Sequence, residues 1–177
     1  LFDSERKIPC QLSDSQGTKK RASCQANNHS IEFEIKNKQD AGSFSKKHAI
    51  PEGTKLQCPT IEFSYKNDEL GDPFINDYYA IAIGAATREE IETITKYAFK
   101  INEVLKEFFA GIGIDLIDFK VEFGRYHGQI ILADEISPDT CRLWDSKTHD
   151  HLDKDRFRRD LADPEGAYAE VCRRIGL

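Results

Sequence analysis

Two acidic residues in the second half of the chain, Glu122 and Asp134, combine the residue type and the spacing of a cation site. A hairpin that turns at residues 127–129 would place them directly opposite each other. Directly opposed residues on one face of an antiparallel pair have Cβ atoms about 4.5–5.5 Å apart. Carboxylates at that separation repel unless a cation or a proton lies between them, and oxygen ligands with open positions suit the Mg²⁺ that bridges nucleotide phosphates. A register shift of one residue would send one carboxylate to the other face.

An ordinary charged surface is the alternative to a cation site, because ionisable residues commonly line the solvent face of a hairpin. The residues that follow the hairpin favour a functional site. Residues 135–145 add acids, hydroxyl groups, Arg142 and the single tryptophan of the chain, Trp144. Segments that follow the end of a strand often carry binding and catalytic residues.

The hairpin itself is predicted from the alternation of its side chains. From Ile117 to Phe123 every second residue is apolar, and ionisable residues lie between them. This period of two is typical of a strand with one buried face. Residues 130–134 begin with two isoleucines and are predicted to form the returning strand. The ionisable residues of the first strand are Asp118, Lys120 and Glu122.

The same alternation predicts two earlier strands, at residues 31–37 and 61–66. Between them, residues 41–47 are expected to form a turn that leads into a short helix. Ser43 in this segment would either cap the helix or offer its hydroxyl group to an anion. The stretch at residues 67–73 contains glycine and proline and is expected to be a turn.

A period of 3.6 residues predicts a long helix that ends near Gly111. Thr87 and Glu90 have the spacing of a capping box, so the helix is expected to begin at this point. Its apolar stripe is expected to cover the core. The residues of that stripe are Ile91, Ile94, Ala98, Ile101, Leu105 and Phe108.

The C-terminal end of the chain is predicted to be a second helix. Asp163 has the residue type of an N-cap, Pro164 suits the first helical turn, and Gly176 marks the end. The segment before it, residues 149–160, is dense in charges of both signs. Such a run is expected to form a solvated face.

Length and composition restrict the class of protein. The chain has 177 residues, of which 39% are hydrophobic and 32% charged, and these values are ordinary for a globular domain with a buried core. The formal net charge of −6 argues against an electrostatic nucleic-acid binder. The sequence shows neither a membrane-spanning apolar run nor a secretory pattern, so we expect a cytoplasmic protein without a membrane partner. Five scattered cysteines fit reduced thiols.

Four stretches of the chain together resemble one known family. They are residues 41–46 (AGSFSK), 65–73 (YKNDELGDP), 116–124 (LIDFKVEFG) and 132–145 (LADEISPDTCRLWD). In this order they resemble motifs of the bacterial phosphoribosylaminoimidazole-succinocarboxamide synthases, also called SAICAR synthetases, from about residue 31 to the end of the chain.

The resemblance implies an α+β fold with an antiparallel sheet, flanking helices and a nucleotide site distantly like that of kinases. Residues 31–177 would form this domain, and residues 1–30 would be an irregular or poorly ordered remnant.

The family resemblance also implies an activity and its ligands. The expected reaction is the ATP-dependent joining of L-aspartate to carboxyaminoimidazole ribotide, which gives SAICAR, ADP and phosphate in purine biosynthesis. ATP and Mg²⁺ would be the cofactors, and a homo-oligomer is a possible assembly. The matching motif positions imply catalysis by Lys120, Asp118 and Asp139, substrate binding by Ser43, Arg142, Asp72 and Lys36, nucleotide binding by Lys66 and Glu122, and Mg²⁺ binding by Glu122 and Asp134.

The sequence departs from the family pattern in two respects. Family members usually carry about sixty further residues upstream, including a β-rich nucleotide segment, and residues 1–30 do not align with that segment, so a truncated or diverged chain is expected. Lys36 stands where the family usually has arginine, which keeps the charge but loses the bidentate fork. An alternative function is therefore a catalytically impaired remnant that acts as a folded non-catalytic or partner-binding domain.

Overall fold

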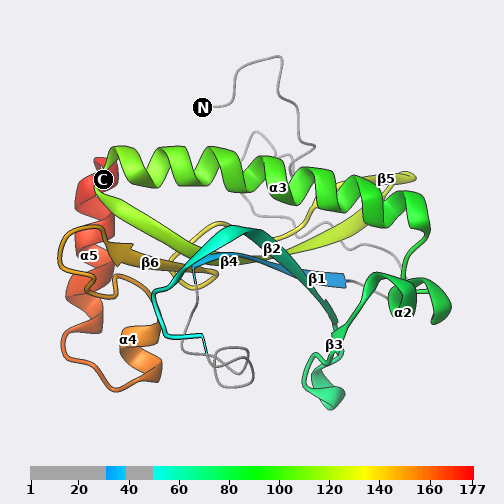
Figure 1. Ribbon diagram of the computed structural model, residues 1–177, viewed down its shortest axis with the longest axis horizontal. Helices are drawn as coiled ribbons and strands as arrows, with labels where there is room; N and C mark the ends of the chain where they lie inside the picture. Colours follow the sequence, from blue (N-terminus) through cyan, green and yellow to red (C-terminus); the bar gives the residue numbers. More distant parts are fainter. Residues whose placement is uncertain (1–30, 39–49) are drawn as a thin grey trace, which may run out of the picture. The chain divides into compact units, whose positions relative to one another are not determined.

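The computed structural model of the chain describes residues 31–38 and 50–177 (Figure 1). The predictions for residues 1–30, for the short helix after residue 41 and for Ser43 lie outside these described residues. The strands are β1 (Ile31–Lys38), β2 (Lys55–Tyr65), β3 (Phe74–Ile75), β4 (Ile114–Tyr126), β5 (Gln129–Leu132) and β6 (Cys141–Asp145). The helices are η1 (Asp68–Leu70), α2 (Asp77–Ala82), α3 (Arg88–Gly111), α4 (Asp155–Arg158) and α5 (Pro164–Ile175).

The strands form a six-stranded sheet with the order β3-β2-β1-β4-β5, and β6 pairs with β4. The pairs β2–β3, β4–β5 and β4–β6 are antiparallel. An antiparallel sheet accompanied by helices is the α+β fold predicted from the sequence. Among the described residues, no helix combines the length and the apolar character needed to cross a membrane.

The described residues divide into two compact units. The first, called the hairpin unit here, comprises residues 31–33, 62–98 and 121–134. The second, called the arginine unit, comprises residues 34–38, 50–61, 99–120 and 135–177. The elements β1, β2, β4 and α3 contribute residues to both units.

The core of the hairpin unit is built around Phe33. Its ring lies edge-on against Phe63 and Phe123, with centroids 4.9 and 5.5 Å away. Tyr97 of α3 lies 6.3 Å from Phe123 on a tilted plane. Edge-to-face aromatic pairs are favourable beyond their buried area, so these two ring contacts link strands β1, β2 and β4 within this unit.

The start of α3 confirms the predicted capping box. The backbone N–H of Thr87 donates to Glu90 Oε2 at 2.8 Å, and the backbone N–H of Glu90 donates to Thr87 Oγ1 at 3.2 Å. These reciprocal bonds satisfy N–H groups that the first helical turn leaves without partners. At the other end the predicted stripe differs by one residue, because Phe109 is buried and Phe108 is half exposed.

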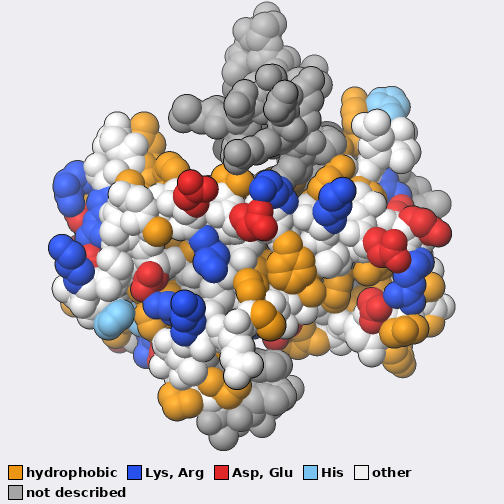
Figure 2. All heavy atoms as spheres, turned by 45° about the horizontal axis from the view of Figure 1, so that its top comes forward, with side chains coloured by type: hydrophobic (Ala, Val, Ile, Leu, Met, Phe, Trp, Pro, Cys, Tyr) orange, Lys and Arg blue, Asp and Glu red, His pale blue; other side chains and the backbone are white. Residues whose placement is uncertain are grey.

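The C-terminal helix α5 begins and ends as predicted. The Asp163 side chain accepts a hydrogen bond from Gly166 N at 3.0 Å, and Pro164 occupies the first turn. Gly176 closes the helix with φ +86°, a backbone conformation that favours glycine. On the face drawn in Figure 2, acidic and basic side chains are intermixed with apolar ones, and neither sign of charge forms a continuous patch.

Candidate functional site

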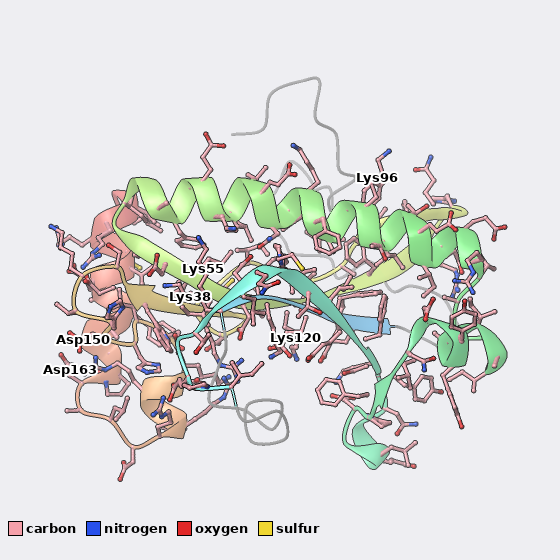
Figure 3. The ribbon with its side chains drawn as sticks, in the orientation of Figure 1. Lys38, Lys55, Lys96, Lys120, Asp150 and Asp163 are labelled. Carbon is pink, nitrogen blue, oxygen red and sulfur yellow. The ribbon has the colours of Figure 1, made fainter. Side chains whose placement is uncertain are left out.

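Strand β4 carries the polar row that the sequence predicted. Ile117, Phe119 and Val121 are fully buried on it, while the side chains of Lys120 and Glu122 are half-buried. Lys120 is labelled in Figure 3. Its backbone N–H donates a hydrogen bond to Thr140 O at 2.8 Å and so connects β4 to the segment before β6. Lys120 thus lies on a strand that is fixed by its backbone contacts.

A β-bulge in β4 aligns Asp118 with Arg142. In the β4–β6 pairing, Leu116 lies opposite Leu143 and Asp118 lies opposite Arg142, so Ile117 is one residue more than the partner strand provides. A bulge changes the direction of the side chains that follow it, and bulges are common next to active sites. Here the extra residue places a carboxylate directly opposite a guanidinium.

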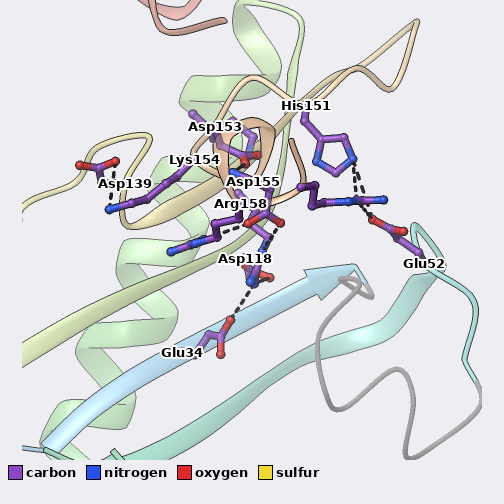
Figure 4. A network of polar contacts seen from close by, with 12 residues as sticks. Glu34, Glu52, Asp118, Asp139, His151, Asp153, Lys154, Asp155 and Arg158 are labelled. Carbon is purple, nitrogen blue, oxygen red and sulfur yellow. Dashed lines mark hydrogen bonds and ion pairs between the residues drawn. The ribbon is translucent and has the colours of Figure 1, made fainter. Parts of the chain in front are cut away.

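Arg142 is the centre of a charged cluster in the arginine unit. Its Nη1 donates to Asp118 Oδ2 at 2.9 Å and to Glu34 Oε1 at 3.2 Å, and its Nε donates to Asp155 Oδ2 at 2.9 Å (Figure 4). Lys36 Nζ lies 2.9 Å from Glu34 Oε1 and 4.0 Å from Asp118 Oδ2. We call these five residues the Arg142 cluster, and their side chains come from β1, β4, β6 and α4.

Burial controls the electrostatics of this cluster. Burial, and to a smaller extent the Glu34 carboxylate, raise the pKa of Asp118, while Arg142 and Lys36 act to lower it, and the resulting pKa is about 7. Asp118 has an exposed fraction of only 3%. For Asp155, burial again acts to raise the pKa, but the hydrogen bonds and charges of Arg158 and Arg142 outweigh it, so its pKa lies below the ordinary value. The cluster therefore contains one readily protonated carboxyl group and one that stays ionised.

Two other predicted site residues meet in the hairpin unit. Lys66, which follows β2, lies with its Nζ 2.9 Å from Asp72 Oδ2. Asp72 Oδ1 accepts a hydrogen bond from the backbone N–H of Asn67 at 2.8 Å, and Asp72 has a positive φ of 49°. These contacts confirm the predicted turn over residues 67–73, which folds back so that the lysine and the carboxylate form an ion pair.

The pairing predicted for Glu122 and Asp134 is wrong by one residue. Tyr126 pairs with Gln129, so the turn contains two residues, His127 and Gly128, and not three. The backbone N–H of Ala133 donates to Glu122 O at 2.9 Å, and Ala133 therefore takes the position opposite Glu122. Asp134 is half-buried and follows the end of β5. The alternation of side chains along β5 therefore does not determine to which face of the sheet the Asp134 side chain points.

Asp139 lies apart from the ion pairs of Arg142 within the arginine unit. Its exposed carboxylate accepts a hydrogen bond from the Tyr168 hydroxyl group at 2.7 Å. Lys154 Nζ lies 3.6 Å from the same carboxylate. Burial and the Asp139 charge raise the pKa of Tyr168 to about 12, so the hydroxyl group remains a donor at neutral pH. The hydrogen bond between Asp139 and Tyr168 thus connects the loop before β6 to α5.

The structure also corrects the prediction for residues 149–160. This segment was expected to be a solvated face, but Leu152, Asp153 and Asp155 are buried. The carboxylates are buried because each has protein donors: Asp153 accepts from the backbone N–H groups of Leu143 and Asp155, both at 2.7 Å. Glu34 and Asp155 were not predicted as site residues. The dense charge of the segment was the available signal, since buried charges require partners.

One group of described residues, His151, Asp153 and Asp155, has possible metal-ligand atoms within 4.8 Å of one another. Nδ1 of His151 is buried and makes no hydrogen bond with the described residues. However, the oxygens of Asp155 already accept hydrogen bonds from Arg142 and Arg158. A cation there would have to share its ligands with two guanidinium groups, so we assign no metal to this group.

Comparison with known proteins identifies the family to which this arrangement belongs. A model of the family described as SAICAR synthetase matches residues 3–175. The chain therefore belongs to the SAICAR synthetase family, as the sequence motifs indicated. The match begins nearer the N-terminus than the four motifs do, and it includes most of the segment that could not be aligned by motif.

Relatives and solved structures agree with the family match. The phosphoribosylaminoimidazole-succinocarboxamide synthase of Lachnoclostridium phytofermentans is 70% identical over 137 residues, which cover 77% of this chain and 58% of that protein. The Ehrlichia chaffeensis enzyme structure is 47% identical with a TM-score of 0.78, covering 81% of this chain and 62% of that one. A SAICAR synthetase structure in complex with ADP is 50% identical with a TM-score of 0.79, covering 82% of this chain and 62% of that one. The chain thus spans about three fifths of the length of these relatives.

Proposed function

We propose that this chain carries substrate and nucleotide sites of an ATP-dependent ligase that joins L-aspartate to carboxyaminoimidazole ribotide. The products would be SAICAR, ADP and phosphate. The observation that carries the proposal is the Arg142 cluster, in which Lys36 and Arg142 both lie within ion-pair distance of Asp118. The family resemblance predicted these three residues from separate parts of the sequence. Membership of the SAICAR synthetase family and the ADP complex of a relative support it.

The proposed chemistry requires activation of a carboxylate. A carboxylate is a poor electrophile, so the γ-phosphoryl group of ATP would first be transferred to the ribotide carboxylate, giving an acyl phosphate and ADP. The aspartate amine would then attack the acyl carbon, lose a proton and displace phosphate. Phosphoryl transfer depends mainly on positioning and on cations that neutralise the developing charge. Lys120 would contact a substrate carboxylate in this scheme, with Asp118 and Asp139 near it.

The cationic members of the Arg142 cluster would bind the ribotide. A guanidinium can donate two parallel hydrogen bonds to a phosphate or a carboxylate. Lys36 would supply a second positive charge as a single point, because an ammonium group cannot form the bidentate fork. Ser43 would donate its hydroxyl group to the same substrate, and Asp72, in the hairpin unit, is a further proposed substrate-binding residue.

Glu122 and Asp134 are the proposed ligands of Mg²⁺, and Lys66 would contact the nucleotide. Both carboxylates belong to the hairpin unit, both are half-buried, and they come from neighbouring positions of paired segments. Carboxylate oxygens are the ligands that Mg²⁺ prefers, and a site of two carboxylates leaves positions for phosphate oxygens. The donor set therefore fits the ion. When bound, Mg²⁺ would neutralise charge on the nucleotide phosphates.

A coupled assay for ADP release, supplied with ribotide, Mg-ATP and L-aspartate, tests the proposed ligase activity. Aspartate-dependent ADP release is the expected result. A second candidate function is that of a folded domain of such a ligase that binds ligands or a partner without turnover. Ribotide binding without ADP release would support this second candidate. Absence of both would contradict both candidates.

The nucleotide site has its own test. Glu122→Ala and Asp134→Ala are each expected to abolish Mg²⁺-dependent ATP binding measured by isothermal titration calorimetry, because each removes a charged ligand. Asp77→Ala is the matched control, since Asp77 is a carboxylate of the same unit that pairs with Arg88 on α3. Unchanged Mg-ATP binding in both site variants would overturn this assignment.

A further inference from the structure

Asp155, at the first residue of α4, binds two guanidinium groups at once. Its Oδ2 accepts a hydrogen bond from Arg142 Nε at 2.9 Å, and its Oδ1 accepts one from Arg158 Nη1 at 2.9 Å. Its exposed fraction is 6%. Both carboxylate oxygens are therefore used inside the arginine unit, and each of them holds a different arginine (Figure 4).

Asp153 fixes the backbone that carries Asp155. Its Oδ1 accepts the backbone N–H of Asp155, and its Oδ2 accepts the backbone N–H of Leu143, both at 2.7 Å. Leu143 is the residue that follows Arg142 on β6. The start of α4 is also held by a hydrogen bond from Lys154 N to Pro138 O at 3.1 Å. Asp155 is thus placed next to the strand that carries Arg142 by backbone contacts on both sides.

The contacts of Arg142 restrict its guanidinium at more than one nitrogen. Asp118 and Glu34 accept from Nη1, and Asp155 accepts from Nε. An arginine side chain has several rotatable bonds and loses entropy when a ligand immobilises it. A carboxylate that already fixes Nε removes part of this cost before binding. In many binding sites, a residue that hydrogen-bonds to the ligand-binding side chain keeps that side chain in its binding orientation.

We propose that Asp155 is a positioning residue that sets the Arg142 guanidinium in place before an anionic group of the substrate binds. This inference rests on the proposed function, in which Arg142 binds the ribotide. It deepens that function by giving a role to a residue outside the four family motifs. Asp155 does not touch the substrate in this scheme and acts only through Arg142.

Asp155→Asn tests the proposal, because asparagine keeps the shape of the side chain and removes its charge. We expect the Kd for carboxyaminoimidazole ribotide, measured by calorimetry on the full chain, to rise about tenfold, which is typical of the loss of a supporting contact. In an Arg142→Lys background, which lacks Nε–H, the same substitution should change the Kd less than about twofold, since residues that act through one another are not additive. Equal effects of Asp155→Asn in the two backgrounds would overturn the proposal.

A spectroscopic readout separates this proposal from the proposed function. The Nε–H signal of Arg142 in a ¹H–¹⁵N NMR spectrum should exchange slowly in the wild-type chain and be lost by fast exchange in Asp155→Ala, which has no acceptor at this position. Asp145→Asn is the matched control, because Asp145 binds Arg174 in the same unit at 2.5 Å and should leave both the Arg142 signal and the Kd unchanged.

The outcomes are distinguishable. A protected Arg142 signal in Asp155→Ala would overturn the positioning role, whatever the ligand. Loss of the signal with an unchanged ribotide Kd would also overturn it. A wild-type chain that binds no ribotide would instead overturn the proposed function, and the NMR signal would still decide whether Asp155 fixes the guanidinium.

Discussion

The Arg142 cluster and the Lys66–Asp72 pair are both predicted to bind substrates, but they are built differently. In the cluster, one guanidinium contacts three carboxylates, and two of these, Asp118 and Asp155, are buried. The Lys66–Asp72 pair joins one ammonium group to one carboxylate, with side chains 29% and 28% exposed. Buried charges are costly to leave without partners, whereas exposed pairs contribute little.

This difference implies a division of roles between the two sites. We expect the cluster to contribute to the fold as well as to the proposed binding, because its members come from four elements that are joined by ionic contacts. The Lys66–Asp72 pair closes a local turn, and water can replace either partner. Substitutions in the cluster should therefore change stability and binding together, and substitutions at the pair should change binding alone.

The largest expected effect is that of Arg142→Ala. Removal of the guanidinium leaves Asp118, Glu34 and Asp155 without their shared partner, so we expect the free energy of unfolding to fall by about 3 kcal/mol at pH 8, as when one partner of a buried ion pair is lost. Urea denaturation followed by circular dichroism measures this value. The loss should be smaller at pH 5, because Asp118 can take up a proton.

Arg142→Lys is the control for this prediction. It keeps the positive charge and should recover part of the stability, although a single ammonium group cannot reach three carboxylates in the same geometry. A loss below about 1 kcal/mol in Arg142→Ala at pH 8, the range of an exposed pair, would show that the cluster and the Lys66–Asp72 pair do not differ as described.

A smaller change in the free energy of unfolding is expected when the pH is varied. Burial raises the pKa of Asp118 to about 7 and that of Asp153 to about 6, from ordinary values of 3.8. The native state therefore holds these protons more tightly than the unfolded state does. The contribution of both groups to stability is fully present below about pH 4 and is lost as the pH rises toward 6 to 7.

Asp118→Asn measures that contribution. The free energy of unfolding of the wild-type chain should contain a component that decreases between pH 5 and pH 7.5, and this component should be reduced in the variant, which cannot ionise at this position. Denaturation at four pH values compares the two slopes. A steeper decrease in the variant would contradict the assignment of the raised pKa to Asp118.

The smallest effect on stability is expected for Lys66→Ala. Its ion pair with Asp72 is partly exposed, so the free energy of unfolding should change by less than about 1 kcal/mol. Calorimetry should nevertheless show weaker Mg-ATP binding, because the variant lacks a positive charge near the nucleotide in the proposed site. Strong destabilisation, comparable to that of Arg142→Ala, would remove the contrast between the two sites.

Local patterns in the sequence predicted much of the fold. The alternation of Ile117 to Phe123 and the capping box of Thr87 and Glu90 depend on neighbouring residues, and the structure confirms both. Strand β6 was not predicted as a strand, because Cys141–Asp145 is short and its pairing with β4 depends on a distant segment. The hairpin register was missed because the turn has two residues, with positive φ at His127 and Gly128.

The charged site was predictable only in part, for a different reason. The family resemblance predicted roles for Lys36, Asp118 and Arg142, but contacts between them arise from strand pairing and from a bulge that the resemblance does not specify. Glu34 and Asp155 were not predicted to belong to it, because an acidic residue in an alternating or charged segment usually faces water. Whether such a residue is buried depends on partners from other elements.

The single tryptophan gives the chain an internal fluorescent reporter. Trp144 lies on β6 in the arginine unit, is only 6% exposed, and its ring lies 4.8 Å from that of His151. The hairpin unit contains no tryptophan in its described sequence. Emission at the indole wavelength therefore follows the arginine unit alone, whereas far-ultraviolet circular dichroism follows the helices of both units. Coincident curves would indicate one cooperative transition, and separated curves would assign each step to its unit.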